Sequence, residues 1–292
     1  MKIGILTRNP NAWVPKQLEE AILKRGHEVA FMSFRALVAR VGYSPKVRAR
    51  DVNVLKEVPA IIVRPIGRCS LDQAIFRMDI LHRLTRLGTV VINHPSAIER
   101  CIDKFYALTL LEESGIPVPR TVVTESVREA MNAFYELGCD VVVKPLFGSR
   151  GLGLTRVTNP EIARRIFNAL NFIHKVLYVQ EFIPHGNKDI RAFVVGDKVI
   201  ASMYRESASW KTNIAQGARP KPLKLNEELE ELAIKAAKVV SCEIAGVDIL
   251  ESPKGYYITE INSQPGWRGI QSVTKVNIAD HIVEYVLAKI KK

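Results

Sequence analysis

The sequence lacks the features of a membrane protein, a disulfide-stabilised protein or a metal-thiolate protein. None of its apolar runs approaches the ~20 residues that a transmembrane helix needs, and the opening MKIGILTRNP has no signal-peptide architecture. The four cysteines lie far apart, without a CxxC pair or a histidine at metal-ligand spacing. We therefore expect a cytoplasmic protein without membrane contact, whose thiols are buried and unpaired: Cys69, Cys101, Cys139 and Cys242.

Motifs for covalent catalysis, hydride transfer and nucleic-acid recognition are also missing. There is no GxSxG elbow or Cys-His pair, and KIGILTRNPNAW lacks the glycine-rich dinucleotide fingerprint. The formal net charge of +12 comes without a zinc finger, helix-turn-helix or RNP-type aromatic motif. The densest basic cluster, KVRAR at 46–50, is interpreted as a solvated face. The charge therefore indicates a small anionic partner, such as a nucleotide or a polycarboxylate, and no nucleic acid.

The 292 residues, 47% of them hydrophobic, are enough for two or three small domains. Residues 1–95 alternate strand-like runs (KIGIL, HEVAFM, AIIVR, TVVIN) with helix-period stretches, which predicts an α/β domain with a parallel sheet. Residues 96–185 form a second unit, in which a helix ends at Gly115 before two prolines. Residues 186–292 contain two hairpins, one turning at Gly196-Asp197 and one around SPKG, and therefore predict an α+β unit.

The first group that carries chemistry is a strand, VVVK, followed by a glycine-rich loop. A lysine at the end of a buried strand, Lys144, can place its ammonium against phosphate oxygens, and a glycine-rich loop lets backbone N–H groups close over them. The sequence fits neither the Walker pattern nor GxGxxG. A plain hairpin turn is the alternative. The loop residues are Gly148, Ser149, Gly151 and Gly153.

A second group follows the strand that ends at Gln180-Glu181-Phe182. Free backbone groups beside an apolar residue can contact an adenine edge, and a carboxylate further on, such as Asp189, can accept a ribose hydroxyl. The alternative is an edge strand that leads into a surface loop.

The third group comprises Asp248, Glu260 and Asn262 on the final hairpin. Glu260 and Asn262 are two residues apart and share a strand face, onto which the partner strand can bring Asp248. Two carboxylates and an amide form an all-oxygen donor set, which suits Mg²⁺ shared with nucleotide phosphates. Three solvated polar residues are the alternative, but the apolar neighbours in GVDIL and ITEIN argue against it.

The fourth group runs from MYR to WKTN. Arg205 offers a planar fork for a carboxylate or phosphate, and Lys211 with Asn213 can neutralise and orient a transferring phosphoryl group. Trp210 is either a stacking wall for a flat ligand or a core residue.

Together these segments resemble the ATP-grasp superfamily, and within it the RimK-like amino-acid ligases, over nearly the whole chain. The similar segments are the one around Lys104, VVVKPLFGSRGLG, QEFI, DIRAFVV, MYR to WKTNIAQGA, GVDI and EINSQPG. The resemblance implies an N-terminal Rossmann-like pre-ATP-grasp domain, a small central lid domain and a C-terminal α+β domain. It also implies that members assemble as homo-oligomers, either dimers or tetramers.

The resemblance assigns a role to each site residue. Lys104 and Lys144 would contact ATP phosphates under the glycine-rich loop, Glu181 and Phe182 would form the adenine hinge, and Asp189 would hold the ribose. Arg191 would lie in the active-site cleft. Lys211 and Asn213 match an Arg-Ser-Asn segment of bacterial relatives that contacts the nucleotide, and Lys211 keeps only the charge of that arginine. Asp248, Glu260 and Asn262 match the ligands of Mg²⁺, for which Mn²⁺ can substitute.

The family chemistry implied is an ADP-forming ligation, in which a carboxylate becomes an acyl phosphate that the amine of an amino acid attacks. Arg205, Lys211 and Arg191 would be the catalytic side chains. PRTVVTESVREAM and the ending VNIAD resemble archaeal ligases that add L-glutamate to tetrahydromethanopterin. The alternatives are ligases that act on a ribosomal protein's C-terminus, the carrier-protein ligases of lysine biosynthesis, and a module that binds nucleotide without turnover.

Overall fold

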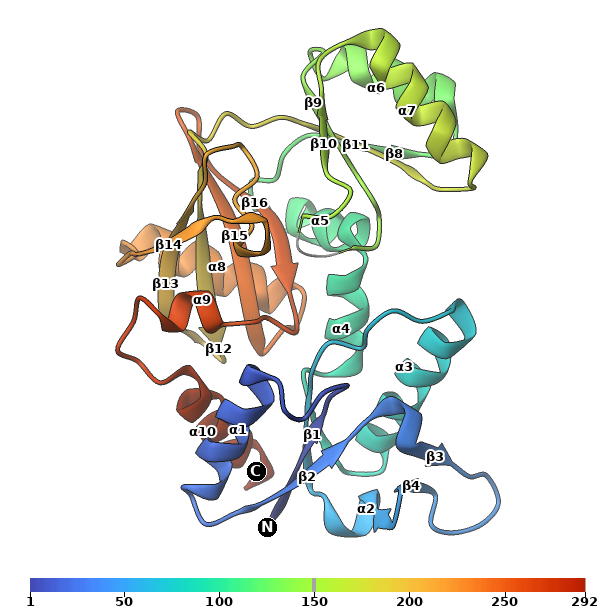
Figure 1. Ribbon diagram of the computed structural model, residues 1–292, viewed down its shortest axis with the longest axis vertical. Helices are drawn as coiled ribbons and strands as arrows, with labels where there is room; N and C mark the ends of the chain where they lie inside the picture. Colours follow the sequence, from blue (N-terminus) through green and yellow to red (C-terminus); the bar gives the residue numbers. More distant parts are fainter. Residues whose placement is uncertain (149–150, 292) are drawn as a thin grey trace.

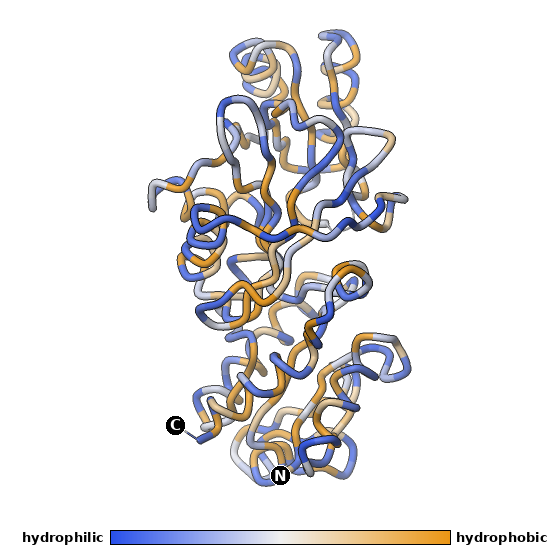
Figure 2. The backbone as a smooth tube through the Cα atoms, turned by 90° about the vertical axis from the view of Figure 1, so that its left-hand side faces the viewer, coloured by the Kyte–Doolittle hydropathy of each residue, from blue (hydrophilic) through white to orange (hydrophobic). Residues whose placement is uncertain are grey.

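The computed structural model of the chain describes residues 1–148 and 151–291. Three units, each built on its own main sheet, follow one another along an elongated molecule, and both termini lie at the same end (Figure 1). Figure 2 shows the same arrangement from the side, with the two chain ends again close together. No helix among the described residues is both long and apolar enough to cross a membrane.

The N-terminal unit contains the parallel sheet that the sequence predicts. Its strands follow the order β2-β1-β6-β7, and every neighbouring pair is parallel. They are β1 (Lys2–Leu6), β2 (Glu28–Met32), β6 (Ala60–Val63) and β7 (Val90–Ile92), and the main helices are α1 (Trp13–Leu23) and α3 (Leu71–Arg86). Ser70 and Gln73 form a capping box that fixes the start of α3.

The sequence did not predict a small antiparallel sheet at the edge of this unit. It is formed by β3 (Leu37–Ala39), β4 (Val47–Ala49) and β5 (Val52–Asn53), together with η1 (Phe34–Ala36) and α2 (Val54–Glu57). Strands of two or three residues are too short to show a period of two in the sequence. The basic KVRAR cluster coincides with β4, where Val47 is buried and the side chains of Lys46 and Arg50 are exposed, so its basic ends are solvated as expected.

Two consecutive helices, α4 (Pro95–Ile102) and α5 (Lys104–Glu113), lead from the first unit to the second (Figure 1). Asp103 caps α5, because its carboxylate accepts from the backbone of Phe105 and Tyr106. The second unit has the sheet order β10-β9-β11-β8, which α6 (Val127–Glu136) and α7 (Pro160–Phe172) cover. Its strands are β8 (Thr121–Thr124), β9 (Val141–Lys144), β10 (Thr155–Val157) and β11 (Leu177–Glu181).

The third unit is an antiparallel sheet with the strand order β14-β13-β12-β15-β16. Its strands are β12 (Lys188–Val195), β13 (Lys198–Glu206), β14 (Arg219–Pro222), β15 (Ile244–Ser252) and β16 (Gly255–Asn262), with η2 (Ile214–Gln216), α8 (Glu227–Val239) and α9 (Arg268–Gln271). The two predicted hairpins, β12–β13 and β15–β16, are confirmed. Gly196 adopts φ +63° in the first turn, as such a turn requires.

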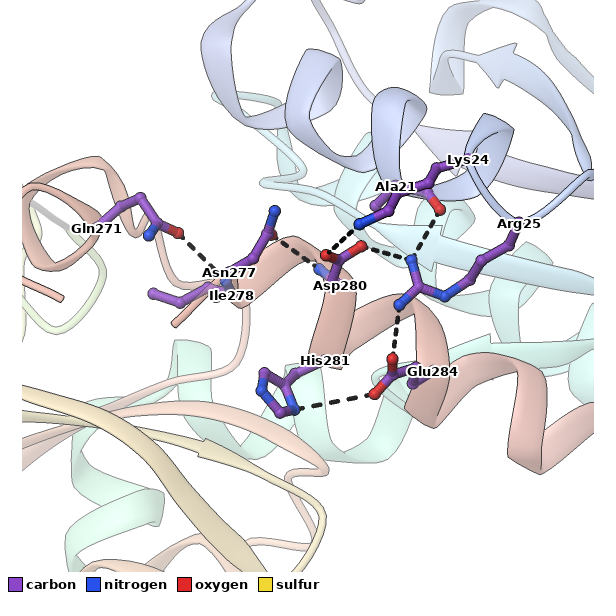
Figure 3. Close-up of polar contacts among 9 residues, drawn as sticks. All are labelled: Ala21, Lys24, Arg25, Gln271, Asn277, Ile278, Asp280, His281 and Glu284. Carbon is purple, nitrogen blue, oxygen red and sulfur yellow. Dashed lines mark hydrogen bonds and ion pairs between the residues drawn. The ribbon is translucent and has the colours of Figure 1, made fainter. Parts of the chain in front are cut away.

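The last helix, α10 (Ile278–Ile290), returns to the N-terminal unit and packs against α1 (Figure 3). Arg25, in the turn that follows α1, forms ion pairs with Asp280 at 2.5 Å and Glu284 at 2.6 Å. Beneath them, Ile3 and Ile5 share one hydrophobic core with Ile282 and with residues of β12 and β13. The first and third units are therefore joined through a common core, which limits their relative movement.

The cysteine prediction is only half correct. Cys101 and Cys242 are buried, whereas Cys69 and Cys139 are partly exposed, and all four thiols are free.

Candidate active site

A cleft between the second and third sheets collects most of the side chains that the sequence suggested. Residues from five separate parts of the chain line it: Lys104, Lys144, Glu181, Phe182, Asp189, Arg205, Lys211, Asn213, Asp248 and Glu260. Arg191 and Asn262 are not among its lining residues, and Ser149 lies outside the described residues.

The strand register of the third sheet explains how its charged residues meet. Asp189 on β12 is directly opposite Arg205 on β13, and Arg191 on β12 is directly opposite Asp248 on β15. Asp248 is in turn opposite Glu260 on β16. Cross-strand partners project from the same face of a sheet, as do residues two apart on one strand. Four strands therefore present one row of charged side chains, in which the two arginines lie beside Asp189 and Asp248, and Glu260 follows Asp248.

The buried part of this row is an ion-pair network. Arg205 donates from Nε to Asp189 Oδ1 at 2.7 Å and from NH2 to Asp189 Oδ2, and its NH2 lies 3.0 Å from Asp248 Oδ1. Arg191 contacts the same Asp248 from its other side, with Nε 2.5 Å from Oδ1. Burial disfavours the charge on Arg205, but Asp248 and Asp189 together outweigh that effect and raise the Arg205 pKa.

This network changes the expected picture of Asp189. The sequence suggested a carboxylate available for a ribose hydroxyl, whereas in the structure both oxygens of Asp189 are paired with Arg205. A carboxylate oxygen has more than one lone pair, so Asp189 can still accept a further hydrogen bond into the cleft. The two contacts with Arg205 fix the orientation of the Asp189 carboxylate.

Asp248, Glu260 and Asn262 fit the requirements of a magnesium site. Asp248 Oδ1 is buried and, despite its two close arginine contacts, has no hydrogen bond of good geometry. The side chain of Glu260 forms no hydrogen bond or ion pair with any other described residue, whereas its backbone belongs to the β15–β16 ladder. No group of three His, Cys, Asp or Glu residues in the described ranges forms a metal cluster. Such a sparse oxygen set suits Mg²⁺, which takes its remaining ligands from phosphates and water.

The opposite wall of the cleft carries two lysines. Lys144 ends β9, and desolvation lowers its pKa to about 8, although the nearby Glu260 carboxylate favours its charged form. Its side chain keeps some contact with solvent in the cleft. Lys104, at the start of α5, donates from Nζ to Gly148 O at 2.7 Å and further disfavours the charge on Lys144.

The glycine-rich loop approaches this wall closely. Gly151 has φ +71°, and a Cβ built on it would lie only 2.2 Å from Asn213 Oδ1. Gly153 has φ +81° and packs against Pro145. The described ends of the loop thus touch Lys104 on one side and Asn213 on the other. Only a residue without a side chain permits the approach of Gly151 to Asn213.

Part of the hydrogen-bonding capacity of the predicted adenine hinge is already used within the protein. The N–H groups of Glu181 and Phe182 already donate to Arg120 O and Asp140 O, and the Glu181 carboxylate pairs with the side chain of Arg120 at 2.8 Å. The Phe182 ring lies 3.5 Å from the guanidinium of Arg156 and contributes an apolar surface to the cleft. Among backbone donors of the described hinge, the N–H of Ile183 is without a partner.

The structure also identifies cleft residues that the sequence did not single out, chiefly His185. It is buried, and its two ring nitrogens lie 2.7 Å from Ile183 O and 2.9 Å from Trp210 O. Trp210, for which two readings were open, is partly exposed and lines the cleft, with its ring 6.0 Å from that of Phe182. His185 therefore ties the hinge to the segment that carries Lys211. An isolated histidine gives no sequence signal for such a role.

Comparisons with known proteins identify the family of the chain. Residues 1–98 match the RimK PreATP-grasp domain, and residues 101–286 match the RimK-like ATP-grasp domain. The chain is 36% identical over 298 residues to the tetrahydromethanopterin:alpha-L-glutamate ligase of Methanocaldococcus jannaschii, with 100% of both chains covered. It is 34% identical to a probable alpha-L-glutamate ligase of Legionella pneumophila, covering 100% of this chain and 97% of that one.

Among solved structures, the ATP-grasp ligase PsnB complexed with minimal precursor, Mg and ADP is similar with a TM-score of 0.77. The identity is 20%, and the match covers 100% of this chain and 98% of that one. That level of identity shows the fold, including the N-terminal pre-ATP-grasp unit. The two domain matches span nearly the whole chain, and the full-length relatives come from both archaea and bacteria. The chain therefore belongs to the RimK-like family of ATP-grasp ligases.

Proposed function

We propose that this protein is a Mg²⁺- and ATP-dependent ligase that joins L-glutamate to a carboxylate-bearing acceptor, in the first place a small coenzyme such as tetrahydromethanopterin. The observation that carries the proposal is the placement of Asp248 and Glu260 opposite each other on one strand pair, facing Lys144 across the same cleft. The full-length relatives named as glutamate ligases support the choice of amino acid.

The reaction needs no nucleophile from the protein, because the acceptor carboxylate itself attacks ATP. An oxygen of the acceptor carboxylate attacks the γ-phosphorus of ATP, ADP leaves, and an acyl phosphate results. The amine of glutamate then attacks the carbonyl carbon, phosphate leaves, and the amine loses a proton. The work of the protein is to position the reactants and to neutralise the charge that moves.

Each part of the cleft has a role in this scheme. Lys144 and Lys104 would hold the phosphates, and the described glycines of the loop, Gly148, Gly151 and Gly153, would cover them. The cleft-facing side chains of Lys211 and Asn213 would orient the transferring phosphoryl group. Asp248, Glu260 and Asn262 would hold Mg²⁺, which supplies charge neutralisation at the phosphates when bound. Mn²⁺ would serve the same site.

The nucleotide base and ribose would occupy the other end of the cleft. The backbone at Glu181 and Phe182, with the free N–H of Ile183, would contact the adenine edge, and Asp189 would accept a ribose hydroxyl while Arg205 holds it in place. Arg205 and Arg191 would act on the reaction through Asp248, because both contact its carboxylate. Arg191 thus supports the site from behind the cleft wall.

The test is a screen of candidate acceptors with ATP and labelled L-glutamate, read by mass spectrometry. The acceptors are pterin coenzymes, acidic carrier proteins and ribosomal proteins. A mass increase of one or more glutamyl units on a pterin, with matching ADP release, is the expected result. ATP binding without ADP release for every acceptor would contradict the proposal and favour a binding module. A cytoplasmic location and a homo-oligomeric state, as a dimer or a tetramer, complete the proposal.

A further inference from the structure

Arg64 is a buried cation that has no acidic partner in the described chain. It follows β6 directly, at the carboxyl end of the N-terminal parallel sheet, where open α/β sheets commonly bind ligands. Only 6% of its surface is exposed, and desolvation alone lowers its pKa to about 10. A buried charge is unfavourable unless a counter-charge or several hydrogen bonds compensate it. An anion bound beside Arg64 would provide that compensation.

The guanidinium of Arg64 is held in one orientation. Its NH2 donates to Pro265 O at 2.7 Å and to Gln264 O at 3.4 Å, and its plane lies 5.1 Å from the ring centre of Trp267. These contacts use one of the three guanidinium nitrogens. The Nε and NH1 groups donate to no other described residue, so each can still donate a hydrogen bond to an acceptor oxygen.

Two further donors beside Arg64 also lack acceptors. Gln264 Nε2 and Trp267 Nε1 are buried and have no hydrogen-bond partner among the described residues. An indole N–H can only donate, so an alternative side-chain orientation with an acceptor function is not open to Trp267. One cation and two N–H donors, with no carboxylate among them, form the complement of an anion with several acceptor oxygens.

The chain segment that carries Gln264 and Trp267 connects this group of donors to the proposed phosphate site. The segment 264–267 continues from Glu260 and Asn262 at the end of β16, so it extends from the proposed magnesium ligands towards the N-terminal unit. On the other side, the loop after Arg64 packs against Arg8, whose Cδ would lie 2.5 Å from a Cβ placed on Gly67. The core shared by the first and third units holds the two halves of the group together.

We infer that Arg64, Gln264 and Trp267 form a carboxylate-binding subsite between the N-terminal and C-terminal units, which orients a substrate carboxylate next to the phosphate-transfer site. The inference rests on the proposed ligase function and specifies where its acidic substrates are recognised. Both L-glutamate and a carboxylate-bearing acceptor carry this chemistry. Occupation of the subsite would give the Arg64 charge its missing partner.

The test compares Arg64→Gln and Trp267→Phe with Arg68→Gln, which removes the same charge from an exposed position on the same loop. Each variant is titrated with L-glutamate and with N-acetyl-L-glutamate, a dicarboxylate without a free amine, and the melting temperature is followed. We expect at least one of the two ligands to stabilise the wild type and Arg68→Gln. For the same ligand, the concentration that gives half of the maximal rise in melting temperature is expected to be at least tenfold higher with Arg64→Gln. With Trp267→Phe this concentration is expected to be intermediate.

Steady-state kinetics then identify the source of the carboxylate. If Arg64→Gln raises the KM for L-glutamate alone, the subsite binds the amino acid. If it raises the KM for the acceptor alone, the subsite binds the acceptor. The affinity for ATP is expected to be unchanged in both cases. Equal ligand midpoints and equal KM values in Arg64→Gln and Arg68→Gln would overturn the inference, even if Arg64→Gln melts earlier. An Arg64-dependent midpoint in a protein that never releases ADP would instead contradict the ligase function and leave the subsite standing.

Discussion

Lys144 and Glu260 face the same cleft from two different sheets, and the Glu260 carboxylate partly offsets the desolvation that lowers the pKa of Lys144 to about 8. A lysine in this state is charged at neutral pH but is close to losing its proton. Its charge therefore depends on what else the cleft contains. A triphosphate would favour the charged form, and removal of Glu260 would disfavour it.

The first prediction concerns the pH dependence of turnover. Because Lys144 of the free enzyme is charged only below about pH 8, we expect kcat/KM for ATP to fall as the pH rises through that value. Lys144→Arg keeps a positive charge throughout this range, and its alkaline decline should move to higher pH even if its maximum is lower. The measurement is a pH profile of ADP release. Identical alkaline limbs for the two proteins would contradict the assignment of Lys144.

The second prediction concerns stability without ligands. The Lys144 pKa is lower in the folded protein than the ~10.4 of an unfolded chain, so its charge destabilises the fold below about pH 8 and this effect disappears as the pH rises towards the unfolded value. We expect Lys144→Met to raise the free energy of unfolding at neutral pH by on the order of 1–2 kcal/mol, a figure reduced for partial solvent contact. Urea denaturation at neutral pH and near pH 10 measures it. A gain that persists unchanged at the higher pH would exclude the electrostatic cause.

The third prediction uses two glycines with the same backbone conformation. Gly151 and Gly26 have φ of +71° and +73°, but only a Cβ on Gly151 would meet another residue, Asn213. Both Gly→Ala variants should lose about 1 kcal/mol of stability from backbone strain. Only Gly151→Ala should raise the KM for ATP, because the loop can no longer approach Asn213. Equal KM values for the two variants would show that this contact has no part in nucleotide binding.

The fourth prediction concerns Arg205, the centre of the ion-pair network. Arg205→Met leaves Asp189 and Asp248 buried without this partner, so we expect a loss of roughly 3–5 kcal/mol in the free energy of unfolding. Lys221→Met breaks an exposed ion pair with Glu206 on the neighbouring strand and serves as the control, with an expected loss of about 0–1 kcal/mol. Chemical denaturation of both variants measures the difference. Similar losses would mean that the buried network contributes no more than a surface pair.

The fifth prediction concerns His185. Replacement by Phe removes both contacts with backbone carbonyls, so the segment with Trp210 and Lys211 should lose its anchor to the hinge, and the KM for ATP should rise by about tenfold, equivalent to the net value of one or two hydrogen bonds. His281→Phe, at an exposed position on α10, is the control. If the His185 variant melts earlier but binds ATP normally, His185 has only a structural role.

The strand and helix pattern of this chain is local, and the sequence therefore predicts most of it. The alternation of Glu260 and Asn262, and the turn at Gly196-Asp197, define the hairpins that carry the charged row. Neither pattern specifies which strands become neighbours. The direct opposition of Arg191 and Asp248 depends on β12 pairing with β15, which are separated by some fifty residues of chain and are brought together by the packing of α8.

Residues whose roles depend on the particular groups that they contact in the folded chain were the ones that the sequence described incompletely. Asp189 was expected to be free for a ribose, but its pairing with Arg205 becomes visible only in the register of β12 and β13. His185 and Arg64 act through backbone carbonyls, for which a sequence carries no side-chain signal. The short strands β3, β4 and β5 were missed because they are held by burial of a few residues and not by a repeated pattern.

The central claim is that Asp248, Glu260 and Lys144 act together on one triphosphate, and the most direct measurement is ADP release by Glu260→Gln in the presence of L-glutamate and an acceptor. This change is nearly isosteric and removes one of two carboxylates from the proposed metal site. The account predicts a loss of at least about a hundredfold in turnover, with a melting curve close to that of the wild type and a steeper requirement for Mg²⁺. Turnover at the wild-type rate with an unchanged Mg²⁺ dependence would contradict it.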